Sequence, residues 1–187
     1  LVFATGTETN FFGMENVKMK SIPMKTINDA IEMRNFILNQ LEVATTLIAD
    51  KEKLLRKLNI VVAGGGPTGV EISGLLAEMQ SSVLRKDYPE LNNTGVQSSI
   101  YLVDGAAQLL TAMSKKSQDD TFDELTKLGV KIILNAQVND YNDDKVYLSN
   151  GQIIESENLI WAAGVVAQVF DEIPKECYGR GKRLITD

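Results

Sequence analysis

A glycine-rich segment in the first half of the chain carries the clearest chemistry. Its glycines follow the pattern G-x-G-x-x-G at Gly64, Gly66 and Gly69, directly after the apolar stretch 59–63 and around Pro67, which suits a first helical turn. The first glycine permits a tight turn, the second lets a pyrophosphate approach the backbone, and the third lets the helix pack closely on the strand. Free N–H groups at the start of the helix attract anions, so the segment predicts a dinucleotide site.

Two other interpretations of this segment stay open. The turn can join a strand to a helix without any ligand, or it can bind another nucleotide, such as FAD or a methyl donor.

Asp104 follows directly after the apolar stretch 99–103, at a position where a carboxylate accepts hydrogen bonds from ribose hydroxyls and repels a 2′-phosphate. Asp104 lies further from the glycine segment than the usual spacing of about 20 residues, and the loop-like residues 82–97 account for the extra length. Asp104 therefore favours NADH over NADPH, unless it is only a solvated acid.

The composition limits the class of protein and of site. The 187 residues carry a net charge of -6, which argues against nucleic acid as the main ligand. The longest apolar stretch, around 160–170, is too short and too rich in glycine and alanine to span a membrane. The chain has no histidine and one cysteine, Cys177, so an imidazole base, a histidine metal ligand, an internal disulfide and a C-x-x-C pair are excluded. We expect a packing or solvent-exposed role for Cys177, no metal site and no catalytic residue of the chain's own.

Hydrophobic periodicity predicts the elements that position these groups. A capping box at Thr26 and Asp29 opens one of the helices. We expect helices at 26–48, 51–58, 67–84 and 115–128, and a loop at 88–95. We expect strands at 1–6, 59–63, 99–103, 130–134 and 159–162, with short β-segments at 137–141, 145–148 and 152–155. The order predicts an α/β fold, a Rossmann-like three-layer β/β/α nucleotide-binding domain with a central parallel sheet and an antiparallel β-meander.

Apolar stripes predict which faces are buried. In the helix at 115–128, Phe122, Leu125 and Leu128 share one face. Trp161 lies in an apolar strand, so we expect it in the core and not as a stacking platform. The stripe of the helix at 26–48, interrupted by Arg34, consists of Ile27, Ala30, Ile31, Ile37, Leu38, Leu41, Ala44 and Ile48.

The segment Val-Ala-Gly-Gly-Gly-Pro-Thr-Gly-Val-Glu-Ile-Ser-Gly, residues 62–74, resembles the NADH-binding segment of type II NADH:quinone oxidoreductases. These are single-subunit flavoproteins of the two-dinucleotide-binding superfamily. The resemblance implies an FAD-dependent NADH dehydrogenase that passes a hydride from NADH to FAD and then electrons to quinone. Other segments are similar to the family in order and spacing, namely 1–13, 25–34, 86–89, 159–165 and 179–187.

The resemblance also implies cofactor contacts. Thr5 and Gly6 would contact FAD in the intact protein. Glu71 would lie near the nicotinamide half, although the helix dipole alone also favours an acid there. The strand-end acid of the family is usually glutamate, and Asp104 is a shorter version of it. The residues implied to bind NADH are Gly64, Gly65, Gly66, Pro67, Thr68, Gly69, Glu71, Asp104, Ala163 and Gly164.

We therefore expect the chain to be a middle piece of a longer protein. Residues 1–23 would be a remnant of the FAD-binding domain, 24–170 the NADH-binding domain, and 171–187 the return segment toward the FAD-binding domain. The FAD fingerprint would lie upstream, and a Gly-Asp motif and membrane-attaching helices downstream. The parent enzyme would be cytoplasmic, peripheral on the cytoplasmic face of the membrane, and able to form a homodimer, whereas this chain alone would be inactive.

Two alternative functions stay open. One is the NAD(P)H-binding domain of another two-dinucleotide flavoprotein, such as a ferredoxin, thioredoxin-type or coenzyme A disulfide reductase. The absence of a C-x-x-C pair disfavours the thioredoxin type. The other alternative is a module that binds NADH without turnover.

Overall fold

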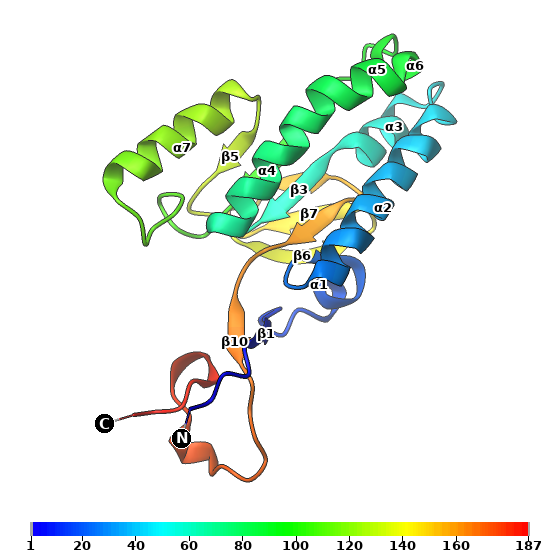
Figure 1. Ribbon diagram of the computed structural model, residues 1–187. Coiled ribbons are helices and arrows are strands. Elements are labelled where there is room, and N and C mark those ends of the chain that lie inside the picture. Colours follow the sequence, from blue (N-terminus) through cyan, green and yellow to red (C-terminus); the bar gives the residue numbers. More distant parts are fainter. Residues whose placement is uncertain (1, 187) are drawn as a thin grey trace.

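A five-stranded parallel sheet forms the framework of the computed structural model, which describes residues 2–186 apart from the side chain of Arg85 (Figure 1). The strand order is β2-β9-β3-β4-β5. Because β4 lies on one side of β3 and β9 on the other, the winding reverses at the end of β3, where α/β sheets commonly bind ligands. The strands are β2 (Ile22–Pro23), β9 (Leu159–Trp161), β3 (Ile60–Ala63), β4 (Ile100–Val103) and β5 (Lys131–Ile133).

Helices cover one face of this sheet, and an antiparallel meander covers the other (Figure 1). The main helices are α2 (Ile27–Thr45), α4 (Pro67–Met79) and α7 (Lys115–Lys127). The meander consists of β6 (Val138–Asn142), β7 (Lys145–Leu148) and β8 (Ile153–Glu155). The predicted three-layer β/β/α fold is confirmed.

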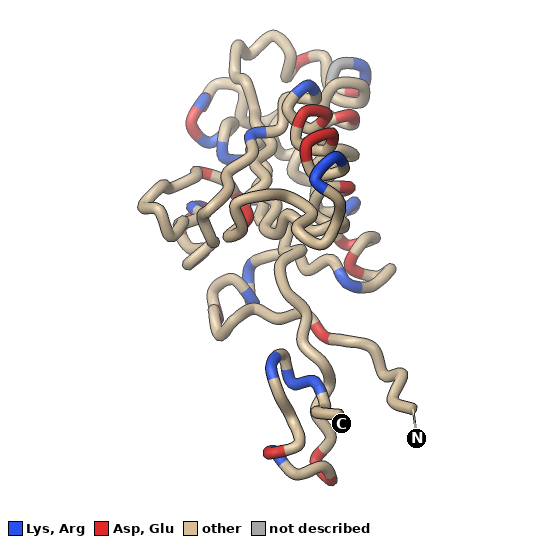
Figure 2. Tube along the Cα trace, turned by 90° about the vertical axis from the view of Figure 1, so that its left-hand side faces the viewer, with Lys and Arg blue, Asp and Glu red and all other residues tan. Residues whose placement is uncertain are grey.

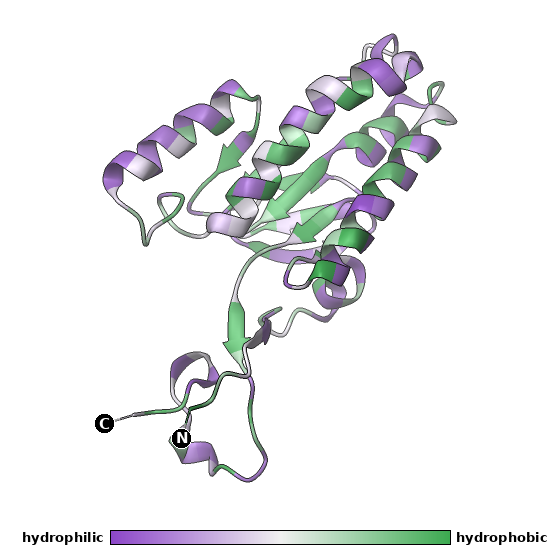
Figure 3. Ribbon diagram, viewed as in Figure 1, coloured by the Kyte–Doolittle hydropathy of each residue, from purple (hydrophilic) through white to green (hydrophobic). Residues whose placement is uncertain are grey.

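Strand β3 contributes to both cores. Ile60 and Val62 belong to the cluster between sheet and helices, whereas Val61 and Ala63 belong to the cluster between sheet and meander. All four side chains are buried. A parallel strand covered on both faces has a continuous apolar sequence instead of an alternating one, which is why 59–63 is so clear a strand in the sequence. Figure 3 shows the same contrast between the apolar strands and the mixed surfaces of the helices.

A third apolar cluster lies at the end of α2. Tyr88 is the member of this cluster that carries a hydroxyl group. The hydroxyl donates a 2.7 Å hydrogen bond to the Glu42 carboxylate, and this bond raises the pKa of Tyr88 to about 12. The loop predicted at 88–95 was partly wrong, because it contains a short helix whose Leu91 is buried in this cluster. The surrounding elements are α3 (Lys51–Leu58), the π-helix η1 (Gln80–Leu84), α5 (Arg85–Asp87) and α6 (Pro89–Asn92).

The two ends of the chain extend together below the sheet (Figure 1). Strand β1 (Thr7–Thr9) pairs antiparallel with β10 (Val165–Ala167). The strand predicted at 1–6 is wrong for residues 2–6, which are exposed and form no strand, because the pairing to β10 begins only at Thr7; Leu1 lies outside the described residues. The other short helices are α1 (Glu15–Lys20), η2 (Lys175–Cys177) and η3 (Arg180–Lys182).

The predicted apolar stripe of α2 combines two faces. Ile37, Leu41 and Ala44 are buried as expected, and Met33 and Gln40 join them. Ile27, Ile31 and Leu38 instead face outward, with Ile27 81% exposed. Periodicity predicts which residues lie on the same side of a helix. When a helix has apolar residues on two sides, periodicity does not predict which side packs on the sheet.

The apolar stripe predicted for α7 also combines buried and exposed residues. Leu125 is buried in the core between sheet and helices. Phe122 and Leu128, which the sequence placed on the same face, are 41% and 42% exposed. The prediction was therefore right for one residue of the three.

We expect Thr26→Ala to lower the free energy of unfolding by about 1 kcal/mol, measured by urea denaturation. The Thr26 side chain accepts a 3.1 Å hydrogen bond from Asp29 N, and the Asp29 carboxylate accepts one of 2.7 Å from Thr26 N. Alanine removes the first of these acceptors. Thr26→Ser keeps the hydroxyl and is the control; an equal loss in both variants would contradict the capping role.

Candidate functional site

The glycine turn joins β3 to α4 at the point where the winding reverses. Gly64 has φ +113°, a region that disfavours side chains. A Cβ added there would lie 2.7 Å from the carbonyl carbon of Ala162, at the end of β9. The backbone of the turn therefore touches the neighbouring strand, and glycine is required at this position for the tight turn expected from the sequence.

Gly66 leaves open space in front of α4. A Cβ added to Gly66 would meet no atom within 4 Å, so the approach to its backbone is free. It is the N-cap residue and offers no side chain to cap the helix, whose first internal hydrogen bond is donated by Val70 N to Gly66 O. The preceding N–H groups of the helix have no carbonyl of the helix to bind, and this arrangement suits a phosphate group.

Gly69 is the residue that closes the helix onto the turn. A Cβ at this position would lie 1.8 Å from the carbonyl oxygen of Gly64 and 3.6 Å from a methyl group of Leu102. Gly69 is buried, so it faces the protein and not the solvent. Gly69 therefore contributes to a ligand site by letting the start of α4 lie close to the turn.

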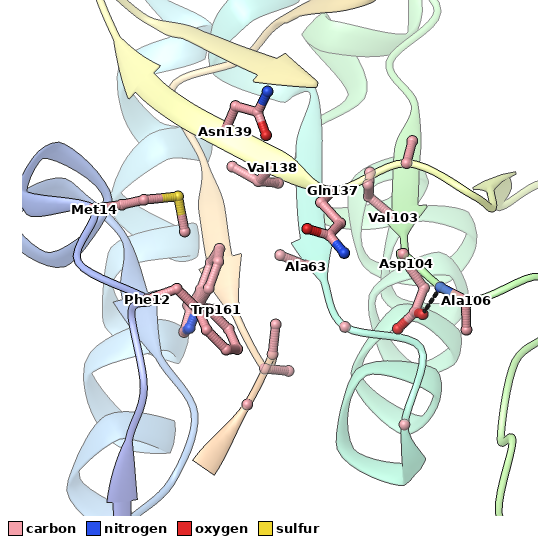
Figure 4. Close-up of a pocket in the computed structure, with 17 residues that line it drawn as sticks. Phe12, Met14, Ala63, Val103, Asp104, Ala106, Gln137, Val138, Asn139 and Trp161 are labelled. Carbon is pink, nitrogen blue, oxygen red and sulfur yellow. Dashed lines mark hydrogen bonds between the residues drawn. The ribbon is translucent and has the colours of Figure 1, made fainter. Parts of the chain in front are cut away.

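A cavity of about 650 Å³ opens at the carboxyl ends of β3, β4 and β9 (Figure 4). This volume is in the range of small-molecule sites. Five of the residues expected from the sequence line it, namely Gly64, Gly66, Asp104, Ala163 and Gly164. The structure thus brings the glycine turn, the strand-end acid and the turn after β9 to one cavity.

Asp104 forms part of the wall of this cavity and is half-buried. One carboxylate oxygen accepts a 2.5 Å hydrogen bond from Gly65 N, and the other accepts one of 2.6 Å from Ala106 N. Gly64 N also bonds within the protein, to Val103 O at 2.8 Å. The backbone donors that remain for an anion in this turn therefore begin at Gly66.

Other residues expected at the site lie elsewhere. Thr68 lines a smaller cavity of about 180 Å³, which shares Ala162 and Gly164 with the large one. Gly65 and Pro67 support the turn without lining the large cavity. Thr5 and Gly6 are exposed in the segment before β1.

Glu71 is exposed on α4 and lines the groove between α4 and α7, together with Glu78, Asp120 and Glu124. Figure 2, which looks onto the side where α7 lies, shows the acidic residues of that helix. The structure therefore does not place Glu71 in the large cavity, and its contact with the nicotinamide half stays a prediction.

Several cavity residues were missed by sequence reasoning. Phe12 and Met14 were assigned to the segment of another domain, and they reach the cavity because α1 packs on the meander through the buried Val17. Gln137 and Asn139 line it from the start of β6, and Figure 4 shows the Gln137 amide between Ala63 and Asp104. Their only sequence signal was the polar alternation around a buried valine.

Trp161 is 3% exposed, which confirms the predicted core position. Its ring stacks on Phe11 at a centroid distance of 6.0 Å, and its Nε1 donates a 3.0 Å hydrogen bond to Asn10 O. One part of the ring still borders the cavity. The tryptophan thus fixes the loop 10–12 against the sheet.

Three further observations concern the residues that the structure describes. None of the helices within residues 2–186 is both long and apolar enough to cross a membrane. Over the same residues, the cysteine and acidic side chains form no group of three or more that suits a metal ion. Cys177 is a free cysteine of intermediate exposure.

The chain is similar to known reductases over almost its whole length. It is 34% identical, over 89% of its residues, to a type II NADH:quinone oxidoreductase of Mycobacterium tuberculosis, of which it covers 36%. It is 30% identical over its full length to an external alternative NAD(P)H-ubiquinone oxidoreductase of Arabidopsis thaliana mitochondria, of which it covers 33%. The chain thus spans about a third of the length of these relatives.

A solved structure has the same fold. NDH2 from Plasmodium falciparum in complex with NADH matches 87% of this chain with a TM-score of 0.78 and 27% identity, and the match covers 34% of that protein. The model of the family described as pyridine nucleotide-disulphide oxidoreductase matches the whole chain, residues 1–187. Together with the glycine turn and the cavity at the switch point, this match shows that the chain belongs to the pyridine nucleotide-disulphide oxidoreductase family.

Proposed function

We propose that the chain is the NADH-binding part of an FAD-dependent NADH:quinone oxidoreductase. The observation that carries the proposal is the cavity at the switch point, where the open face of Gly66 and the start of α4 lie beside Asp104. Relatives named as NADH:quinone oxidoreductases and a neighbour solved with NADH support the same function.

The residues of the cavity fit the parts of a dinucleotide. The pyrophosphate would rest against Gly66, where no side chain blocks the backbone. The adenosine half would lie toward Asp104 and Gln137, and the nicotinamide half toward Ala163 and Gly164. The protein would orient the dinucleotide, and the bound flavin of the parent enzyme would supply the hydride acceptor and the electron path to quinone.

The proposal divides the chain as the sequence suggested, with 24–170 as the NADH-binding domain and 171–187 as a return segment. The packing of residues 11–23 favours extending that domain toward the N-terminus, since Val17 is buried under the meander and β2 is a strand of the central sheet. Thr5 and Gly6 keep their proposed contact with FAD in the parent enzyme. A peripheral location on the cytoplasmic face of the membrane and a homodimer also stay predictions.

We expect NADH to bind more tightly than NADPH, by about tenfold or more, in calorimetric titrations of the purified chain. The reason is the carboxylate of Asp104, whose negative charge beside the turn repels a 2′-phosphate. Equal affinities would contradict this role of Asp104. Binding of neither nucleotide would contradict the proposed function itself.

A further inference from the structure

The Asp104 carboxylate uses both of its oxygens inside the protein. Oδ2 accepts a hydrogen bond from Gly65 N at 2.5 Å, and Oδ1 accepts one from Ala106 N at 2.6 Å. Hydrogen bonds to an ionised acceptor are about twice as strong as bonds between neutral groups. Because one donor belongs to the glycine turn and the other to the loop after β4, the carboxylate joins these two segments.

The backbone of Asp104 connects a third segment. Asp104 N donates to Ile133 O at 2.9 Å, and Asp104 O accepts from Ala136 N at 3.1 Å. These bonds tie the loop after β4 to the loop after β5, which leads to Gln137 at the cavity. Asp104 thereby connects three of the segments that surround the dinucleotide site.

The space around Asp104 suits an acid of this length. A Cβ added to Gly65 would lie 3.0 Å from the Asp104 Cβ and 2.7 Å from a methyl group of Leu109, so the turn is in close contact with both residues. A glutamate has one more methylene group, and this group would carry the carboxylate past the N–H of Gly65. The short side chain is therefore matched to the bond with the turn.

We propose that Asp104 is a positioning residue, whose carboxylate holds the glycine turn in the geometry that receives the pyrophosphate of the dinucleotide. The ribose contact expected from the sequence is then secondary to this role. A turn that is fixed before the ligand arrives loses less conformational entropy on binding, so it binds more tightly. The inference rests on the proposed function and specifies how the site achieves its affinity.

The test compares two ligands in three variants of the full 187-residue chain. ADP carries the pyrophosphate, whereas adenosine keeps the ribose hydroxyls and lacks any phosphate. Asp104→Glu keeps the charge and changes the length, and Asp104→Asn keeps one oxygen acceptor but places N–H donors against a backbone N–H. Asp120→Glu, at an exposed acid of α7 in the groove beside α4 and outside the large cavity, is the matched control. Calorimetry gives the affinity for ADP, and NMR titration gives the weaker affinity for adenosine.

We expect Asp104→Glu to weaken ADP binding by about tenfold or more, with adenosine affinity within about twofold of the wild type. Amide exchange of Gly65 and Ala106 should accelerate in the same variant, and the control should match the wild type. A loss of general stability alone would leave the ratio of the ADP and adenosine affinities unchanged, which would overturn the proposal.

Two other results would also overturn the positioning role. Wild-type ADP affinity in Asp104→Glu would show that the acid is not needed at this length. An equal loss of ADP and adenosine affinity in a variant that unfolds at the same urea concentration as the wild type would show that the acid binds the ribose directly. If the wild-type chain bound ADP and NADH, only the inference would fail in these cases; if it bound neither, the proposed function would fail as well.

Discussion

Gly69→Ala is expected to lower the free energy of unfolding by about 3 kcal/mol or more, the largest stability effect of any substitution in the site. The added Cβ would lie 1.8 Å from the carbonyl oxygen of Gly64, far inside van der Waals contact. The atom that it meets is backbone, and the Gly64 backbone is itself held by a hydrogen bond to Val103 of β4 and by contact with the end of β9. The turn cannot give way as a flexible side chain would.

The measurement is urea denaturation followed by the fluorescence of Trp161, the one tryptophan of the sequence, which is buried at the end of β9. Gly74→Ala is the matched control on the same helix, because its Cβ would lie 3.7 Å from Leu125, an ordinary contact. Alanine there should be neutral or stabilise α4 by up to about 1 kcal/mol, since glycine is the poorer helix former. Similar unfolding curves for the two variants would contradict the argument.

The glycine turn could be read from the sequence because its constraints are local. Whether a Cβ fits at Gly69 depends on the carbonyl group of Gly64, five residues earlier, and the positive φ of Gly64 belongs to the turn itself. The continuous apolar run of β3 predicts a strand buried on both faces, and the capping box at Thr26 predicts the start of α2. For the turn and the capping box, the sequence contains both partners of the interaction within a few residues, and for β3 the apolar run itself is continuous in the sequence.

The parts that could not be predicted depend on partners far apart in the chain. Phe12 and Met14 reach the cavity only because α1 packs on the meander, more than a hundred residues later in the sequence. The location of Glu71 in a groove outside the large cavity depends on where α7 lies beside α4. The exposed stripe of α2, including Ile27, has the same apolar residue types as the buried stripe, so periodicity alone cannot separate them.

Asp104 lies between these two cases. Its position at the end of a strand after a glycine fingerprint was visible in the sequence, and so was the ligand class that such an acid favours. Its hydrogen bonds to Gly65 and Ala106 were not, because they depend on the distance between two loops and on the length of one side chain. The sequence therefore predicts which residue matters, and the structure shows the contacts through which we propose that it acts.

Gly66→Ala is expected to separate binding from stability. The residue has φ −78° and ψ −177°, which any amino acid adopts, and its added Cβ would meet nothing within 4 Å. The free energy of unfolding should therefore stay within about 0.5 kcal/mol of the wild type. NADH affinity should fall by about tenfold or more, because the methyl group occupies the space through which the pyrophosphate reaches the backbone N–H groups.

Calorimetry with NADH and urea denaturation of the same preparation test both halves of this prediction. Gly74→Ala, on the same helix and outside the large cavity, should bind NADH as the wild type does. Wild-type NADH affinity in Gly66→Ala would show that the pyrophosphate does not rest on this turn. A stability loss as large as that of Gly69→Ala would show that the space in front of Gly66 is not free in solution. The two glycines, three residues apart, would thus divide the motif into one position required for folding and one required for the ligand.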